Sequence, residues 1–173
     1  VDDIPYRPTV EVTDYPKAGD PNPKVKLGIA RVTGGAPVWV DLNSYSALDF
    51  LIVNVDWAPS SAEVVFQVQD REQTWLDLNL ADRTTGRARR VLRETTKAWV
   101  NENGNPVWLR DGSFLWLSER DGFKHVYHYT VDGTLRRQVT NGRWEVRTLY
   151  GVDDASSGVY FSAPERHAIS TDI

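Results

Sequence analysis

The sequence of 173 residues contains no cysteine and no methionine, and it has only three histidines. Without cysteine, the chain can form no disulfide, no thiol nucleophile and no thiolate ligand for zinc. No apolar run approaches the roughly 18 residues that a membrane-spanning helix needs, and the mean hydropathy is −0.45. We therefore expect no membrane span, while the absence of cysteine leaves the cellular compartment open.

A surplus of basic charge is also missing. Lys and Arg number 20, Asp and Glu number 24, and the net charge is −4. Because proteins that bind nucleic acids normally carry a basic surface, we expect no nucleic-acid partner. The chain begins with Val-Asp-Asp-Ile and shows no charged-then-apolar leader, so we expect it to be excised from a longer protein.

The residues that are abundant favour β-strands. Seven Trp and seven Tyr accompany many Val, Leu and Thr. Asx-Gly pairs recur between alternating segments, at 111–112, 121–122, 132–133 and 141–142. Both positions of such a turn favour positive φ, so these pairs predict hairpins. No window shows a steady apolar stripe at helical spacing, and the pattern therefore predicts an all-β fold.

Similar strand groups repeat along the chain. The group at residues 114–139 combines an apolar run, an alternating strand and a more polar strand, separated by two Asp-Gly turns. A comparable group covers residues 64–92, and a third begins at Gly158. The residues that open the three groups are 51 and 44 positions apart: Trp57, Trp108 and Val152.

A period of about 40–50 residues with four strands per repeat is typical of β-propeller blades. We therefore expect residues 24–173 to form about three antiparallel four-stranded blades, the last one truncated. This is a partial β-propeller, whose other blades lie outside the chain. Residues 1–23 contain five prolines and predict an extended arm, after which residues 25–32 alternate as a strand.

Catalytic and metal-binding patterns are weak in this sequence. There is no Gly-x-Ser-x-Gly, the usual setting of a hydrolase serine. His125 and His128 are three positions apart on a predicted strand and so point to opposite faces. The loop at 101–105 lacks the aspartates and the terminal glutamate of a calcium loop. We expect no catalytic residue, no cofactor and no metal site. The aromatic residues around Trp116 and Tyr127 are interpreted as packing between blades.

Three segments resemble the dipeptidyl peptidase IV family in the same order. Residues 15–25 contain Tyr-Pro-Lys-Ala-Gly followed by Asn-Pro, residues 114–127 contain Ser-Glu-Arg-Asp-Gly-Phe-Lys-His-Val-Tyr, and residues 142–146 read Gly-Arg-Trp-Glu-Val. The resemblance implies a propeller, normally of eight blades, that covers a C-terminal α/β-hydrolase domain. Members are serine peptidases that release N-terminal dipeptides, preferentially after proline or alanine.

The resemblance places the catalytic triad beyond Ile173 and the Glu-Glu pair that binds the substrate amine before Val1. Neither is carried onto this chain, which alone should be inactive. An aromatic-Arg pair that touches substrate in some members follows Trp-Val. Here Trp99-Val100 is followed by different residues, so no role is transferred. The implied partners are the hydrolase domain of the same parent chain and a peptide substrate.

The arm resembles the extension that pairs family dimers, which implies a homodimer. The residues assigned to the dimer arm are Tyr15, Pro16, Lys17, Ala18 and Gly19. A two-stranded ribbon with unpaired edges can pair with a second copy, and a two-fold axis makes that contact self-complementary. The alternative for this segment is a surface excursion held by its own blade.

Two other functions stay open. One is a non-catalytic β-repeat module that binds peptide or protein partners, and the other is a self-contained small hydrolase. A Gly-x-Ser-x-Gly downstream and a Glu-Glu upstream in the parent reading frame would favour the peptidase. For the parent we expect a periplasmic or secreted protein.

Overall fold

The computed structural model describes Tyr6, Val10 and residues 12–13, 15–21, 23–153 and 158–164. The strands in these residues are β1 (Gly28–Ile29), β2 (Val38–Trp39), β3 (Phe50–Trp57), β4 (Glu63–Asp70), β5 (Trp75–Asp82), β6 (Ala88–Thr95), β7 (Val107–Trp108), β8 (Phe114–Ser118), β9 (His125–Tyr129), β10 (Leu135–Gln138), β11 (Thr148–Asp153) and β12 (Gly158–Ser162). A single 3₁₀ turn, η1 (Asn43–Tyr45), is the one helical element of this described part. The prediction of an all-β fold is confirmed. No described helix has the length and apolar character to cross a membrane.

The first four-stranded sheet is an antiparallel meander in the order β3-β4-β5-β6. Its two central strands are buried on both faces, because neighbouring sheets cover both sides. The pairing register of β5 with β6 shifts between Leu78 and Asn79. This bulge places Arg90 opposite Asn79 and Arg93 opposite Asp77, so two residues three apart share a face of the sheet.

The second four-stranded sheet has the order β10-β9-β8-β7, which confirms the meander predicted for residues 114–139. Its central strands β8 and β9 are almost wholly buried, whereas every residue of β10 is exposed. The more polar sequence of β10 therefore fits an outer edge strand, where charged side chains discourage pairing with another chain.

Three turns around the second sheet share one form. The glycine N–H donates to the carbonyl oxygen three residues earlier, at 3.0 Å for Gly112, 2.9 Å for Gly122 and 2.9 Å for Gly133. Only the glycines have positive φ, so the expectation that both Asx and Gly adopt it was wrong. The preceding aspartate instead accepts the N–H two residues after it, which fixes the turn from its side chain.

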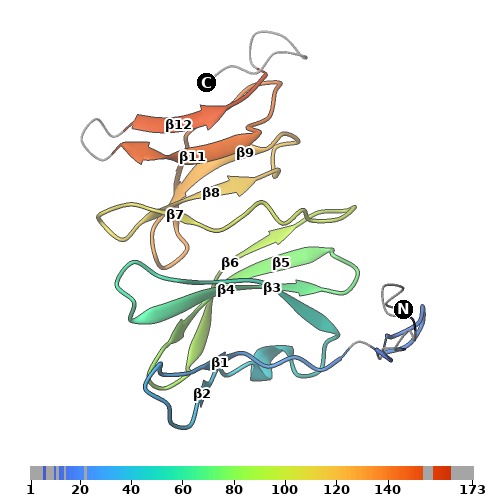
Figure 1. Cartoon of the computed structure of the whole chain (residues 1–173). Coiled ribbons are helices and arrows are strands. Elements are labelled where there is room, and N and C mark those ends of the chain that lie inside the picture. The colour runs from blue at the N-terminus through green and yellow to red at the C-terminus, as the bar shows by residue number, and fades with distance from the viewer. Residues whose placement is uncertain are drawn as a thin grey trace.

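Two-stranded sheets flank the four-stranded ones. Figure 1 shows β1–β2 at one end of the stack and β11–β12 at the other. The strand expected over residues 25–32 is confined to Gly28–Ile29, because its partner β2 pairs over two residues only. The strand expected from Gly158 is β12, and it pairs with β11.

The apolar core lies between the sheets. The largest cluster joins the first and second sheets and contains Ala58, Val65, Leu76, Leu78, Leu80, Val91, Leu92, Val100, Phe114, Trp116, Tyr127 and Tyr129. This confirms that Trp116 and Tyr127 pack between sheets. Further clusters join β1–β2 to the first sheet and β11–β12 to the second. Fully burying one such large side chain stabilises the fold by roughly 1.5–3 kcal/mol, so each sheet depends on its neighbours.

Candidate functional site

Several connections between strands gather at one end of the stacked sheets, on the right in Figure 1. Arg71, in the turn after β4, donates to the carbonyl oxygen of Asp20 and to the carboxylate of Asp49. In the connection between β6 and β7, Asn101 donates to Glu119 of the β8–β9 turn. Loops at one end of rigid sheets are the usual carriers of binding residues. Two hollows open among these loops, and they form the candidate site.

The smaller hollow, here named the polar hollow, has a volume of about 220 Å³ and opens where the ends of β6 and β8 meet. It is lined by Glu94, Thr95, Thr96, Trp99, Val100, Asn101, Asn103, Ser118, Glu119, Arg120 and Gly122. Trp99 is 64% exposed. An exposed ring beside amides and carboxylates suits the recognition of a peptide, which offers both apolar and hydrogen-bonding groups.

A buried carboxylate forms the floor of the polar hollow. Glu94 accepts hydrogen bonds from Trp116 Nε1 at 3.1 Å and from Ser118 Oγ at 2.8 Å. It also pairs with Arg120 at 2.5 Å. The Arg120 guanidinium lies 4.6 Å from the centre of the Tyr127 ring. These contacts join the two four-stranded sheets and hold Arg120 in one orientation.

Glutamine side chains of β4 hold the connection between β6 and β7, residues 96–106. Gln67 Nε2 donates to the carbonyl oxygen of Gly104 at 3.0 Å, and Gln69 Nε2 donates to that of Val100 at 2.7 Å. Both glutamines are almost completely buried. The Val100 N–H in turn donates to the carbonyl oxygen of Gln73, whose φ of 60° is unusual for a residue other than glycine. These hydrogen bonds therefore hold the backbone of the loop that carries Trp99 in one position.

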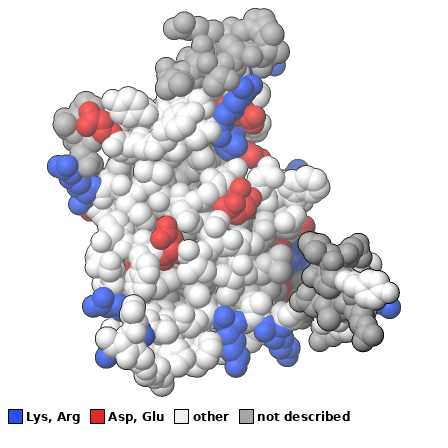
Figure 2. All heavy atoms as spheres, viewed as in Figure 1, with Lys and Arg blue, Asp and Glu red and all other residues white. Residues whose placement is uncertain are grey.

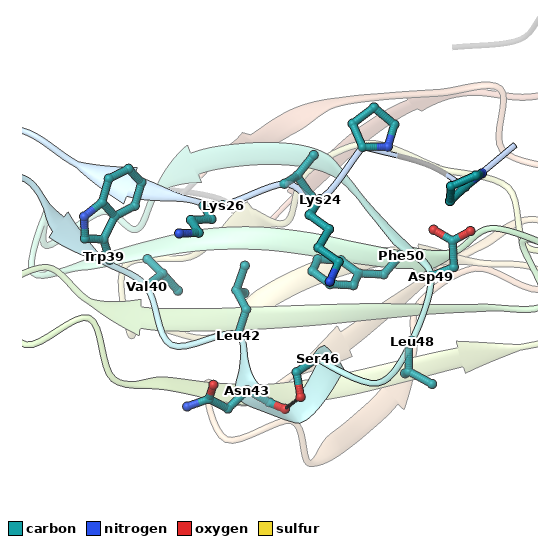
Figure 3. Close-up of a pocket in the computed structure, with 13 residues that line it drawn as sticks. Lys24, Lys26, Trp39, Val40, Leu42, Asn43, Ser46, Leu48, Asp49 and Phe50 are labelled. Atoms are coloured by element: carbon teal, nitrogen blue, oxygen red, sulfur yellow. Dashed lines mark hydrogen bonds between the residues drawn. The ribbon is translucent and has the colours of Figure 1, made fainter. Parts of the chain in front are cut away.

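The larger hollow lies where the arm joins the sheets, and we name it the arm-root groove (Figure 3). Its volume is about 720 Å³. It is lined by Pro21, Pro23, Lys24, Val25, Lys26, Trp39, Val40, Leu42, Asn43, Ser46, Leu48, Asp49 and Phe50. Figure 3 shows the Lys24 side chain extending into the groove towards Leu42 and Phe50.

The five residues assigned to the dimer arm, 15–19, are all exposed. The last three of them belong to a turn over residues 17–20, in which the Asp20 N–H donates to the Lys17 carbonyl oxygen at 3.0 Å. The Lys17 N–H donates to the Asp20 carboxylate at 2.9 Å. Several residues of the predicted arm lie outside the described residues. The contact between Arg71 and Asp20 ties the end of the arm to the first sheet.

Charged side chains are unevenly spread on the face seen in Figure 2. Uncharged atoms cover most of the middle of the stack, whereas Lys and Arg side chains line the lower margin, near β1–β2. The arm-root groove contributes two of the chain's lysines to the same part of the molecule. A positive margin of this kind attracts acidic groups at short range.

His125 and His128 each lie within hydrogen-bond distance of neighbouring side chains or carbonyl groups, which is typical of histidines with a structural role. The ring nitrogens of His125 lie 3.1 Å from Thr140 Oγ1 and 3.1 Å from the Gly142 carbonyl oxygen. His128 Nε2 lies 2.8 Å from Ser113 Oγ. Burial, followed by two nearby arginines, lowers the pKa of His128 below its usual range. Among the described residues no group of His, Asp and Glu is arranged to hold a metal ion.

A second buried carboxylate lies away from both hollows. Asp77 accepts two hydrogen bonds from Arg93, at 2.6 and 2.7 Å, and one from the Tyr45 hydroxyl at 2.9 Å. The Arg93 guanidinium also stacks on Trp75 at 4.3 Å. Burial and the neighbouring Asp77 raise the pKa of Tyr45 well above its usual range. Asp77, on β5, therefore fastens η1 to the first sheet and strengthens the pairing of β5 with β6.

Sequence reasoning did not find the polar hollow. Glu94 and Arg120 are 26 positions apart and meet only because their strands belong to neighbouring sheets. One signal was available: Gln67 and Gln69 interrupt an otherwise apolar strand at every second position. Buried amides at such positions need partners, and this requirement points to a nearby loop.

The comparisons with known proteins cover nearly the whole chain. The family profile of the dipeptidyl peptidase IV N-terminal region matches residues 2–173. Mouse inactive dipeptidyl peptidase 10 is 29% identical over 171 residues, which is 91% of this chain and 21% of that protein. Dipeptidyl peptidase 4 of Trichophyton equinum is 24% identical over 92% of this chain and 21% of its own length.

A solved structure gives the same assignment. The crystal structure of Porphyromonas gingivalis dipeptidyl peptidase 4 matches with a TM-score of 0.81 and 28% identity, over 91% of this chain and 22% of that chain. The chain thus spans about a fifth of the length of these relatives. Because the stacked sheets superpose on that structure and the family profile covers residues 2–173, this chain belongs to the dipeptidyl peptidase IV N-terminal region family and forms part of its β-propeller.

Proposed function

We propose that this chain is an arc of the propeller of a serine-type dipeptidyl peptidase that releases N-terminal dipeptides ending in proline or alanine. The family match over residues 2–173 carries the proposal. The ring has eight blades, and the Ser-Asp-His triad belongs to a C-terminal α/β-hydrolase domain of the parent protein. The propeller restricts access to that domain and positions the peptide.

The loop end of the sheets is the part of this chain that faces the peptide. The exposed Trp99 ring, the Asn101–Glu119 pair and the fixed Arg120 offer an apolar surface and hydrogen-bonding groups side by side. None of these groups is a nucleophile with a base beside it, so their contribution is binding and orientation. A residue that only binds changes KM more than kcat.

The test compares the parent protein with this chain on Gly-Pro-p-nitroanilide. The parent should release p-nitroaniline and lose activity with a serine-directed inhibitor, whereas the 173-residue chain should show no turnover. In the parent, Trp99→Ala should raise KM for a longer peptide substrate with little change in kcat. A parent without inhibitor-sensitive cleavage would refute the proposal.

The arm, with residues 15–19 exposed, is proposed to contribute to a homodimer. An exposed segment gains hydrogen bonds and apolar contacts when a second copy covers it. Sedimentation of the parent should give a dimer, and deletion of residues 15–19 should weaken it. The parent is also proposed to be periplasmic or secreted, which cell fractionation followed by the peptidase assay tests.

A second candidate function is a propeller module in a parent without peptidase activity. The relatives from mouse and rat that carry the name inactive dipeptidyl peptidase 10 favour it. The parent reading frame separates the two candidates. A Gly-x-Ser-x-Gly downstream and a Glu-Glu upstream support the peptidase, and loss of the serine supports the binding module.

A further inference from the structure

We propose that Asn103, in the connection between β6 and β7, is a site of self-catalysed deamidation in which the Glu102 carboxylate acts as the base. The inference goes beyond the proposed function, because it concerns chemistry within the loop itself. Asn103 is followed by Gly104, and an asparagine side chain reacts most readily with the next backbone nitrogen when that residue has no Cβ in the way. Asn103 is partly exposed and lines the polar hollow, so water reaches it.

The Glu102 carboxylate lies beside the proton that must leave. The Gly104 N–H donates to Glu102 Oε1 at 2.6 Å. The same oxygen accepts a hydrogen bond from Asn54 Nδ2 at 2.5 Å, and this contact holds the carboxylate against β3. A group within hydrogen-bond reach of a proton is placed to remove it as a general base. Asn54 therefore orients Glu102, and Glu102 acts on the nitrogen of Gly104.

The backbone around the reacting nitrogen has room for ring closure. Gly104 has a φ of +93°, and nothing lies within 4 Å of a Cβ added there. Its carbonyl oxygen accepts from Gln67 Nε2 at 3.0 Å, and the same nitrogen donates to Asn105 Oδ1 at 3.1 Å. These hydrogen bonds hold the loop in one position, while the open space beside Gly104 accommodates the succinimide ring.

The reaction balances with water as its only co-reactant. Glu102 takes the proton of the Gly104 nitrogen, which attacks Cγ of the Asn103 side chain and forms a new C–N bond. The intermediate expels the side-chain nitrogen, which receives the proton from Glu102 and leaves as ammonia. Water then opens the succinimide at one of its carbonyl carbons and yields aspartate or isoaspartate. Glu102 ends as the carboxylate with which it began, as a general acid–base catalyst does.

The chain contains a second Asn-Gly pair, Asn141-Gly142, in a different setting. His125 Nε2 lies 3.1 Å from the Gly142 carbonyl oxygen. A Cβ added to Gly142 would lie 2.3 Å from Trp144 Nε1, so this backbone is closely packed. Ring closure there must displace packed groups, and we expect it to be slower. The two pairs have the same sequence, and only their contacts distinguish them.

Deamidation would change the charge of the polar hollow. It adds a carboxylate at position 103 to a wall that already carries Glu94 and Glu119, with Arg120 beside them. This consequence, unlike the reaction, rests on the proposed function. If the hollow binds peptide, the modified parent should show a higher KM for an acidic peptide relative to a basic one, because like charges repel.

Peptide mass spectrometry measures the reaction directly. The folded 173-residue chain is incubated at neutral pH in water enriched in ¹⁸O and then digested with trypsin. Residues 98–110 form one tryptic peptide, which contains Asn101, Asn103 and Asn105, and residues 138–143 form another, which contains Asn141. We expect ¹⁸O at position 103 at least about tenfold faster than at position 141. Asn105 should stay unchanged, because Pro106 has no N–H to lose.

Two variants and a denaturant test the role of the carboxylate. Glu102→Gln should slow the reaction of Asn103 at least about tenfold and leave that of Asn141 unchanged. The matched control Glu145→Gln, on an exposed residue of the connection between β10 and β11, should leave Asn103 reactive. In urea the rates at positions 103 and 141 should become similar, since both pairs then lose their contacts. This last comparison needs no variant.

The outcomes separate the inference from the proposed function. Equal rates at positions 103 and 141 in the folded chain would overturn the inference, as would a rate at position 103 that Glu102→Gln does not change. Neither measurement depends on peptidase activity. A parent without peptidase activity would refute the proposed function and leave the deamidation site in place.

Discussion

The contact between the β9–β10 turn and the bulge of β6 gives the sharpest test of the packing between sheets. Gly133 has a φ of +88°. A Cβ added there would lie 1.8 Å from the carbonyl oxygen of Val91 and 2.8 Å from its carbonyl carbon. Both atoms belong to the backbone of the neighbouring sheet, which cannot turn aside as a flexible side chain can. Gly133→Ala must therefore push the two sheets apart.

The magnitude follows from two contributions. A non-glycine residue in the left-handed region costs roughly 1–2 kcal/mol. Separation of the sheets also weakens the hydrogen bond from Arg89 to the Val131 carbonyl oxygen, now 3.2 Å, and loosens apolar packing beside it. We expect Gly133→Ala to lower the free energy of unfolding by about 3–4 kcal/mol in total, the range of the larger single-residue effects.

Gly112 provides the matched control. It occupies the same position in a turn of the same form, with a φ of +78°, and nothing lies within 4 Å of an added Cβ. Gly112→Ala should therefore show only the conformational cost, roughly 1–2 kcal/mol. Urea unfolding, followed by far-ultraviolet circular dichroism, measures both variants. Equal destabilisation of the two would refute the idea that the turn of one sheet is pressed against the backbone of the next.

Three further predictions concern other parts of the chain. Asp77→Ala should cost about 3 kcal/mol in urea unfolding because it leaves the Arg93 side chain without its buried acceptor, whereas Arg136→Ala, which removes an exposed ion pair, should cost less than about 1 kcal/mol. Gln69→Leu should accelerate amide hydrogen exchange in the connection between β6 and β7 while leaving β8 and β9 protected, since a buried carbonyl oxygen loses its donor. The pKa of His128 should lie below 6.5 in an NMR titration. Because folding lowers this pKa, the associated stability is complete above pH 6.5 and is lost as the pH falls through the lower native value.

Much of the fold could be predicted from local patterns. Two neighbouring strands are specified by the apolar run at 114–117 and the alternation at residues 124–129. Both the two-residue period of a strand and the Asp-Gly turn between these segments depend only on residues close together in the sequence. The inward position of Trp116 also follows, since large aromatic side chains need burial on a sheet face that a neighbour covers. These features depend on short stretches of sequence.

The site depends on contacts that sequence spacing does not reveal. Arg90 and Arg93 would lie on opposite faces of a regular strand, and only the bulge in β6 brings both to Asp77. Residues of two sheets line the polar hollow, and the groove combines the arm, η1 and the start of β3. Their formation requires the relative placement of whole elements, which is set by the packing of the core.

The central claim is that these residues form an arc of a closed propeller, and the structure of the whole parent protein tests it most directly. A cryo-electron microscopy map or crystal structure of the parent should show β1–β2 and β11–β12 each extended to four strands by flanking residues. The sheets β3–β6 and β7–β10 should lie stacked between them, as in Figure 1, and the whole ring should close around a common axis. A parent in which β1–β2 and β11–β12 remain two-stranded, or are covered by helices instead of further sheets, would contradict the account.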